Sequence, residues 1–182
     1  MTGERSFTPA LGHAALTPLY DSAIALMTRE QRWRERLLQQ ISPHARDVIV
    51  DVGCGTGTLA LMIKRATPAA TVIGLDPDPE VLSRARLRAQ RAGLAIEFEQ
   101  GFARDVARFA NRGVTKVVSS LVLHQVPMDE KRAALAAMRA VLAPNGEAHI
   151  ADYGLQRTKL MRLLFAQVQM LDGQENTTPN AE

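Results

Sequence analysis

The sequence predicts a doubly wound α/β fold, in which a mostly parallel sheet carries helices on both faces. Short runs of branched apolar residues alternate along the chain with longer amphipathic segments, as strands alternate with crossover helices in this class. Glycine, proline and other turn residues punctuate the boundaries between these segments. At 182 residues, of which 46% are hydrophobic and 23% charged, the chain suits one domain with one sizeable core.

The first half of this domain is predicted as a helical cap followed by two strand–helix units. Apolar residues recur at helical spacing over 17–41, with a break near Thr28, and the pair Ser42-Pro43 ends the helix. Asp78 suits the N-cap of a later helix, because its carboxylate can accept from free backbone N–H groups and Pro79 fits the first helical position. In chain order we expect strands at 47–52 and 71–75 and helices at 56–65 and 79–92.

The second half continues the alternation. We expect strands at 95–99, 115–121 and 147–151, a short helix within 102–112, a helix at 129–142, a turn at 144–146 and a last amphipathic helix at 157–171. Right-handed crossovers leave few arrangements of these strands, and the best is a sheet of order 3-2-1-4-5. The single domain (1–182) then divides into a helical cap (1–45), a core (46–156), a C-terminal helix (157–172) and a polar tail (173–182).

The composition gives limited information about binding partners and cellular location. The formal charge of +3 is compatible with a nucleic-acid partner but does not require one. No apolar run approaches the ~18–20 residues that span a bilayer, and the N-terminus makes a poor signal peptide. Cys54 is the one cysteine, so an intramolecular disulfide is excluded. We therefore expect a cytoplasmic protein without a membrane span.

The carboxyl ends of the predicted strands carry the candidate site, because doubly wound sheets bind ligands there. The first end is D-V-G-C-G-T-G at 51–57. It lacks the G-x-x-x-x-G-K-[ST] pattern of a phosphate-binding loop, and Thr58 stands where a dinucleotide fold places its third glycine. Asp51 would add like charge beside a pyrophosphate but suits a cation. A plain turn without a ligand would be a costly use of three glycines.

Three further motifs follow D-V-G-C-G-T-G along the chain. They are I-G-L-D-P at 73–77, V-V-S-S-L-V-L-H-Q-V-P at 117–127 and V-L-A-P-N-G-E-A-H-I-A-D at 141–152. In this order the four motifs resemble class I S-adenosylmethionine-dependent methyltransferases, in particular methyltransferase type 11 and the ubiquinone and menaquinone biosynthesis methyltransferases. The resemblance extends over roughly residues 17–172. It implies a Rossmann-like sheet, S-adenosyl-L-methionine as cofactor and S-adenosylhomocysteine as product.

The resemblance also implies how the cofactor is held. Asp51 would serve its ammonium group, Asp76 its ribose hydroxyls and the helix N-terminus near 56–58 its carboxylate. Phe102 would either stack on the adenine or fill the core, and Tyr20 would either cap the methionyl end or lie elsewhere. The implied cofactor-binding residues are Tyr20, Asp51, Gly53, Cys54, Gly55, Gly57, Asp76, Pro77, Gly101, Phe102 and Ser119.

The sequence departs from the family pattern in three places. No acid follows the third strand, where the sequence reads Q-G-F-A, and Thr115 stands near the position of an acid at the head of strand four. Strands six and seven of the family have no counterpart, which leaves strand five as an edge. That edge, or the C-terminal helix, offers a surface for a homodimer.

The acceptor side is predicted at the ends of strands four and five. His124 would act there as the general base, or would bond to a loop carbonyl and shape the pocket. Tyr153 is the second catalytic candidate, and Gln125, Asp152 or Tyr153 would orient the acceptor. We expect no metal, because the histidines are scattered.

Three functions remain open from the sequence. The first is methyl transfer to a small molecule, with an aromatic or quinol-like acceptor. The second, methylation of RNA or DNA, is disfavoured because the segment after strand four lacks the [N/D]-P-P-[Y/F] pattern of enzymes that methylate base amines. The third is cofactor binding without catalysis.

Overall fold

The fold is seen in a computed structural model that describes residues 30–152. Within that range a sheet of five parallel strands has the order β3-β2-β1-β4-β5, which confirms the predicted fold class and strand order. The N-terminal part of the cap with Tyr20, the residue Tyr153, the C-terminal helix and the tail lie outside the described residues. The homodimer stays a prediction.

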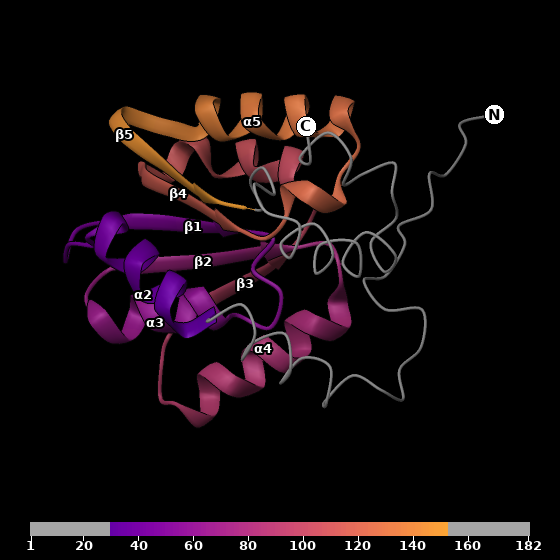
Figure 1. The fold of residues 1–182 in the computed structure, drawn as a ribbon. Helices are drawn as coiled ribbons and strands as arrows, with labels where there is room; N and C mark the ends of the chain where they lie inside the picture. The colour runs from indigo at the N-terminus through magenta and orange to yellow at the C-terminus, as the bar shows by residue number, and fades with distance from the viewer. Residues whose placement is uncertain (1–29, 153–182) are drawn as a thin grey trace.

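The elements alternate along the chain as expected (Figure 1). The strands are β1 (Val48–Val52), β2 (Thr71–Asp76), β3 (Glu97–Gln100), β4 (Val114–Ser120) and β5 (Leu142–Ala151). The α-helices are α2 (Glu30–Ile41), α3 (Thr58–Ala66), α4 (Pro79–Arg91) and α5 (Met128–Val141). Two 3₁₀ segments follow β3 and β4, namely η1 (Ala103–Arg112) and η2 (Leu123–Gln125).

Helices cover the two faces of the sheet in separate groups, as Figure 1 shows for α5 on one side and α2, α3 and α4 on the other. Side chains of a strand point alternately to the two faces, so Ile49 joins a core with α2, α3 and α4 while Val50 joins a core with η1 and α5. Burial on both faces explains why the central strands read as continuous apolar runs. The carboxyl ends of all five strands therefore meet at one edge of this three-layer structure.

The predicted start and end of α4 are confirmed. The Asp78 carboxylate accepts from the backbone N–H of Glu80 at 2.7 Å, and Pro79 is the first helical residue. Gly93 follows the helix with a φ of +65°, a conformation that glycine adopts without a steric penalty. Local chemistry thus determines where this helix begins and ends.

The turn predicted between α5 and β5 lies inside the strand instead. Leu142 already pairs with Val114, and the next pairing joins Lys116 to Glu147, so residues 143–146 form a bulge in β5. Asn145 supplies the left-handed backbone there, with a φ of +65°. The prediction that β5 begins at Glu147 is therefore wrong, because pairing with β4 starts before the bulge.

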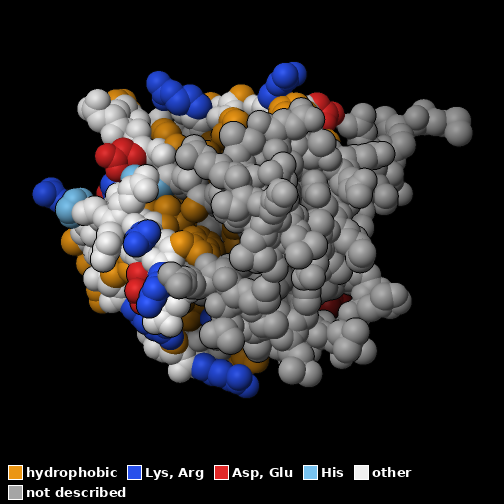
Figure 2. All heavy atoms as spheres, viewed as in Figure 1, with side chains coloured by type: hydrophobic (Ala, Val, Ile, Leu, Met, Phe, Trp, Pro, Cys, Tyr) orange, Lys and Arg blue, Asp and Glu red, His pale blue; other side chains and the backbone are white. Residues whose placement is uncertain are grey.

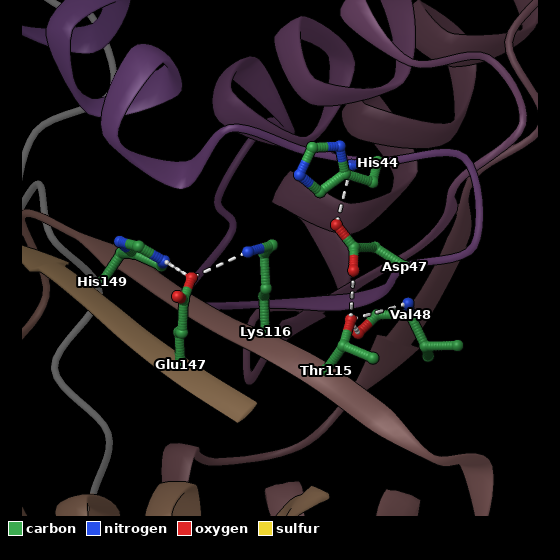
Figure 3. Close-up of polar contacts among 7 residues, drawn as sticks. All are labelled: His44, Asp47, Val48, Thr115, Lys116, Glu147 and His149. Carbon is green, nitrogen blue, oxygen red and sulfur yellow. Dashed lines mark hydrogen bonds and ion pairs between the residues drawn. The ribbon is translucent and has the colours of Figure 1, made fainter. Parts of the chain in front are cut away.

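Two sets of polar contacts join β4 to the start of β1 and to β5 (Figure 3). The Thr115 hydroxyl donates to Asp47 across 2.8 Å, so it joins β4 to the start of β1. Lys116 pairs with Glu147 at 2.7 Å, and Nε2 of His149 lies 3.1 Å from the same carboxylate oxygen. None of these residues belongs to the loops that follow the strands and carry the candidate site.

Candidate functional site

The Gly-rich turn after β1 has a backbone that only glycine tolerates easily. Gly53, Gly55 and Gly57 have φ values of +70°, +51° and +77°. A Cβ added at Gly53 would also clash with the side chain of Val122 in the loop after β4. The turn is held against β2, because Gly53 N–H donates to the Leu75 carbonyl at 2.7 Å. The backbone thus passes close to the carboxyl end of the sheet before α3 begins.

Asp51, at the end of β1, is a buried carboxylate without a hydrogen-bond partner. Its exposed fraction is 1%, and neither oxygen is bonded to any described residue. Burial raises its pKa to about 7, while the Arg34 charge opposes the shift. The backbone N–H of Ala60 lowers the pKa as well, although it does not complete a hydrogen bond. Because an unpaired buried charge is costly, this position suits a cationic ligand group.

Asp76 ends β2 with both carboxylate oxygens held by the backbone. Gly55 N–H donates to Oδ2 at 2.8 Å and Asp78 N–H donates to Oδ1 at 3.0 Å. Burial raises the pKa of Asp76, and these two donors oppose the shift. A carboxylate has about four lone-pair positions, so each oxygen can still accept from one hydroxyl of a diol.

The loop after β3 presents an exposed aromatic ring. Phe102 is 42% exposed and belongs to neither core, so it does not fill the interior. Its backbone N–H donates to Asp105 at 2.8 Å, and the guanidinium of Arg104 lies over its ring, 4.8 Å from the centroid. Arg104 is itself paired with Glu130 at 2.6 Å. The ring is therefore supported from one side, next to Gly101.

Three other predicted cofactor residues have structural contacts. The Ser119 hydroxyl is buried and donates to the Val52 carbonyl at 2.9 Å, and the Pro77 carbonyl accepts from Gln100 at 3.1 Å. Cys54 is 8% exposed, and burial raises the pKa of its thiol, so it is not activated as a nucleophile. These contacts shape the loops that would surround a cofactor.

The acceptor side contains a pair of side chains that the sequence did not place together. His124, in η2, is 2% exposed, and its Nδ1 lies 2.7 Å from Oδ1 of Asp152. Asp152 follows β5, and its Oδ2 accepts from the backbone N–H groups of Leu123 and His124 at 2.6 and 3.2 Å. Among the described residues, His124 thus has a carboxylate as a hydrogen-bond partner. Asp152 contacts His124, and the orientation of the acceptor by Gln125, Asp152 or Tyr153 stays a prediction.

Two arginines near the site were missed by sequence reasoning. Arg34 reaches from α2 to the hydroxyl of Ser120, 3.3 Å away at the end of β4. Arg88 is an exposed residue of α4, and its Nη1 lies 2.8 Å from both oxygens of Thr56. Only the folded arrangement brings α2 and α4 next to these loops. Between residues 30 and 152, no group of His, Cys, Asp and Glu side chains is arranged to hold a metal ion.

Known proteins are similar to this chain over the region that contains the candidate site. The methyltransferase domain family matches residues 49–146, which is more than half of the chain. Demethylmenaquinone methyltransferase of Thermus thermophilus is 31% identical over 140 residues, which cover 76% of this chain and 62% of that protein. Release factor glutamine methyltransferase of Deinococcus radiodurans is 41% identical over 85 residues, or 46% of this chain and 31% of that protein.

A solved structure shares the fold. The YcgJ protein from Bacillus subtilis superimposes with a TM-score of 0.63 at 20% identity, over 75% of this chain and 57% of that one. The chain thus spans less than two thirds of the length of these relatives. None of the helices between residues 30 and 152 is long and apolar enough to cross a membrane. On its sequence, strand order and Gly-rich turn, this chain belongs to the methyltransferase domain family.

Proposed function

We propose that this chain binds S-adenosylmethionine at the ends of β1, β2 and β3 and transfers its methyl group to a small aromatic or quinol-like molecule. The observation that carries this proposal is the buried carboxylate of Asp51, which has no hydrogen-bond partner among the described residues. A cationic amino-acid group beside it would relieve the cost of that unpaired charge. The family of the chain makes this cofactor the natural source of such a group.

Residues at the ends of β2 and β3 fit the remaining parts of the cofactor. Asp76 keeps lone pairs for the two ribose hydroxyls, and the exposed ring of Phe102 can stack on the adenine. The glycines let the ligand approach the backbone. When bound, the cofactor supplies a methyl group on a sulfonium, which is already a good electrophile. The protein has to align the acceptor, exclude water and accept a proton where one is released.

The quinol-like acceptor is favoured by the extent of the similarities. The demethylmenaquinone methyltransferase matches 76% of this chain, whereas the glutamine methyltransferase matches only 46%. On the face in Figure 2, the described Lys and Arg side chains lie at the upper rim and on the lower left, with Asp and Glu side chains among them, so this part of the surface has mixed charge. His124 stands at the end of β4 as the candidate base.

Calorimetric titration with S-adenosylmethionine tests the cofactor site. Asp76→Ala should weaken binding about 10- to 100-fold, because hydrogen bonds to a charged group contribute ~1.5–3 kcal/mol. Glu80→Gln, an exposed carboxylate two residues into α4, is the matched control and should bind normally. Transfer of labelled methyl would then be measured over quinols, phenols and amines. A folded protein that binds NAD but not S-adenosylmethionine would rule out the proposal.

A further inference from the structure

The ends of β4 and β5 are joined by a short bond between two titratable side chains. Nδ1 of His124 and Oδ1 of Asp152 are 2.7 Å apart, although the residues are separated by 28 positions in the chain. Both groups are shielded from solvent, with side-chain exposures of 2% and 13%. A bond of this length is typical of a charge-assisted pair.

The second carboxylate oxygen fixes the orientation of Asp152. Oδ2 accepts from the backbone N–H groups of Leu123 and His124, so the carboxylate faces donors on both oxygens. Hydrogen bonds of this kind favour the ionised form of an acid. An ionised carboxylate can only accept, so Nδ1 of His124 must carry the proton that it shares with Asp152. In the neutral imidazole the lone pair is then on Nε2.

We propose that Asp152 is a positioning residue, which holds His124 in the tautomer whose Nε2 can take a proton from a hydroxylated aromatic acceptor. This inference rests on the proposed methyl transfer and names the acceptor as one that must lose a proton. The acceptor oxygen forms a bond to the methyl carbon as the carbon–sulfur bond breaks, and the electron pair of that bond stays on sulfur. The hydroxyl proton passes to Nε2 and later to solvent. Asp152 stabilises the imidazolium that forms.

A second charged group lies near the pair. Lys131 of α5 is buried, which lowers its pKa, while the charge of Asp152 opposes this shift. Lys131 and Asp152 therefore act on the imidazolium with opposite sign, one from α5 and one from the end of β5. The hydrogen bond to Asp152 is a direct contact, so loss of this carboxylate should change the tautomer and the titration of His124.

The substitution Asp152→Asn distinguishes two roles of Asp152. One is to set the tautomer of His124, and the other is only to accept hydrogen bonds from the loop backbone. Asparagine has the same shape, and its carbonyl oxygen can still accept from the two backbone N–H groups. Its NH₂ group, however, would donate to Nδ1 and shift the imidazole proton to Nε2, which can then no longer act as a base. The hydrogen bonds from the backbone N–H groups of Leu123 and His124 would survive this change, but the basic Nε2 of His124 would be lost.

The tautomer is measured first, by long-range ¹H–¹⁵N spectra of protein labelled at histidine nitrogen, without cofactor. His124→Gln identifies the signals of His124 among the four histidines. The unsubstituted protein should show a protonated Nδ1 at high pH, and Asp152→Asn should show a protonated Nε2 and a lower titration midpoint. Glu80→Gln, which removes an exposed carboxylate elsewhere, should change neither.

The kinetic measurement uses a phenol or quinol acceptor. Asp152→Asn and His124→Gln should each lower kcat about 10²-fold or more and remove the neutral step of the pH profile, with cofactor affinity nearly unchanged. An unaltered tautomer in Asp152→Asn, or a kcat within a few-fold of the original, would overturn the proposal. Failure of S-adenosylmethionine to bind would instead refute the proposed function, while the spectra would still decide whether Asp152 sets the tautomer.

Discussion

Arg88 on α4 is hydrogen-bonded to Thr56 in the Gly-rich turn, 32 residues earlier in the chain. Its Nη1 lies 2.8 Å from both the carbonyl and the hydroxyl oxygen of Thr56 and 3.0 Å from the hydroxyl of Thr58. One guanidinium nitrogen thus joins α4 to the last residues before α3 and to the first residue of that helix. The contact fixes the part of the turn where the cofactor's carboxylate is expected.

Arg88→Ala should therefore weaken cofactor binding more than it weakens the fold. Exposed polar contacts contribute little to stability, so the free energy of unfolding should fall by less than ~1 kcal/mol. The affinity for S-adenosylmethionine should fall about 3- to 10-fold, because the turn must be ordered when the ligand binds. Titration calorimetry and urea unfolding give the two numbers. Arg84→Ala, on an exposed position one turn earlier, is the control, and equal effects of both substitutions would contradict a specific contact.

Asp51 should make both stability and cofactor binding depend on pH. Its pKa is raised to about 7 in the folded protein, whereas an unfolded Asp titrates near 4. Between these values the folded state holds a proton that the unfolded state has lost. Stability without cofactor should therefore decrease as pH rises from about 4 to about 7, and then stay at the lower level. Asp51→Asn should lose this component of the pH dependence, which unfolding curves at several pH values would show.

Cofactor binding should lower the pKa of Asp51 that burial has raised. A positive group beside Asp51 lowers the pKa of the carboxyl, so complex formation at pH 6 should release close to one proton from this site, and much less at pH 8. Calorimetry in buffers of different ionisation enthalpy measures this proton release. Asp51→Asn is the control for protons from the ligand itself. Equal proton release by both proteins at pH 6 would show that Asp51 does not face the cation.

The sequence was sufficient where local chemistry decides the structure. The alternation of apolar strands and amphipathic helices predicted the sheet and its order, and Asp78 with Pro79 predicted the start of α4. The bulge in β5 could not be predicted in this way, because it depends on the pairing of Leu142 with Val114 across the sheet. Local pattern places a strand but does not show which partner residue it meets.

In the candidate site, too, some features follow from the local sequence and others depend on the fold. The Gly-rich turn and the acids at the ends of β1 and β2 follow from motif and position along the chain. The bond between His124 and Asp152, by contrast, joins two loops whose distance only the folded sheet determines. The contact between Arg88 and Thr56 could not be predicted for the same reason, since the spacing of residues along a helix gives no sign of the turn beside it. Motifs thus indicated which loops matter, and the fold showed how their side chains pair.

Gly74 provides a test of how closely β2 packs under the Gly-rich turn. A Cβ at this position would lie 2.7 Å from Cδ1 of Phe98 and 2.8 Å from Sγ of Cys54. Gly74→Ala should therefore destabilise the protein by ~1–3 kcal/mol, the usual cost of overpacking a core. Cys54 belongs to the turn, so S-adenosylmethionine binding should weaken as well. Urea unfolding and titration calorimetry measure the two effects.

The clash in Gly74→Ala can be relieved by a smaller side chain at Phe98 or at Cys54. These substitutions therefore test whether the clash causes the loss of stability and of cofactor affinity. Phe98→Leu and Cys54→Ala would each cost stability alone, but each should cost less, or restore some stability, in the Gly74→Ala background. A double-mutant cycle should give an interaction energy of ~0.5–3 kcal/mol for these contacting pairs. Recovery of cofactor affinity is expected with Cys54→Ala, since removal of Sγ lets the turn return to its position. Additive losses in both cycles would mean that the strand accommodates the methyl group without pressing on the turn.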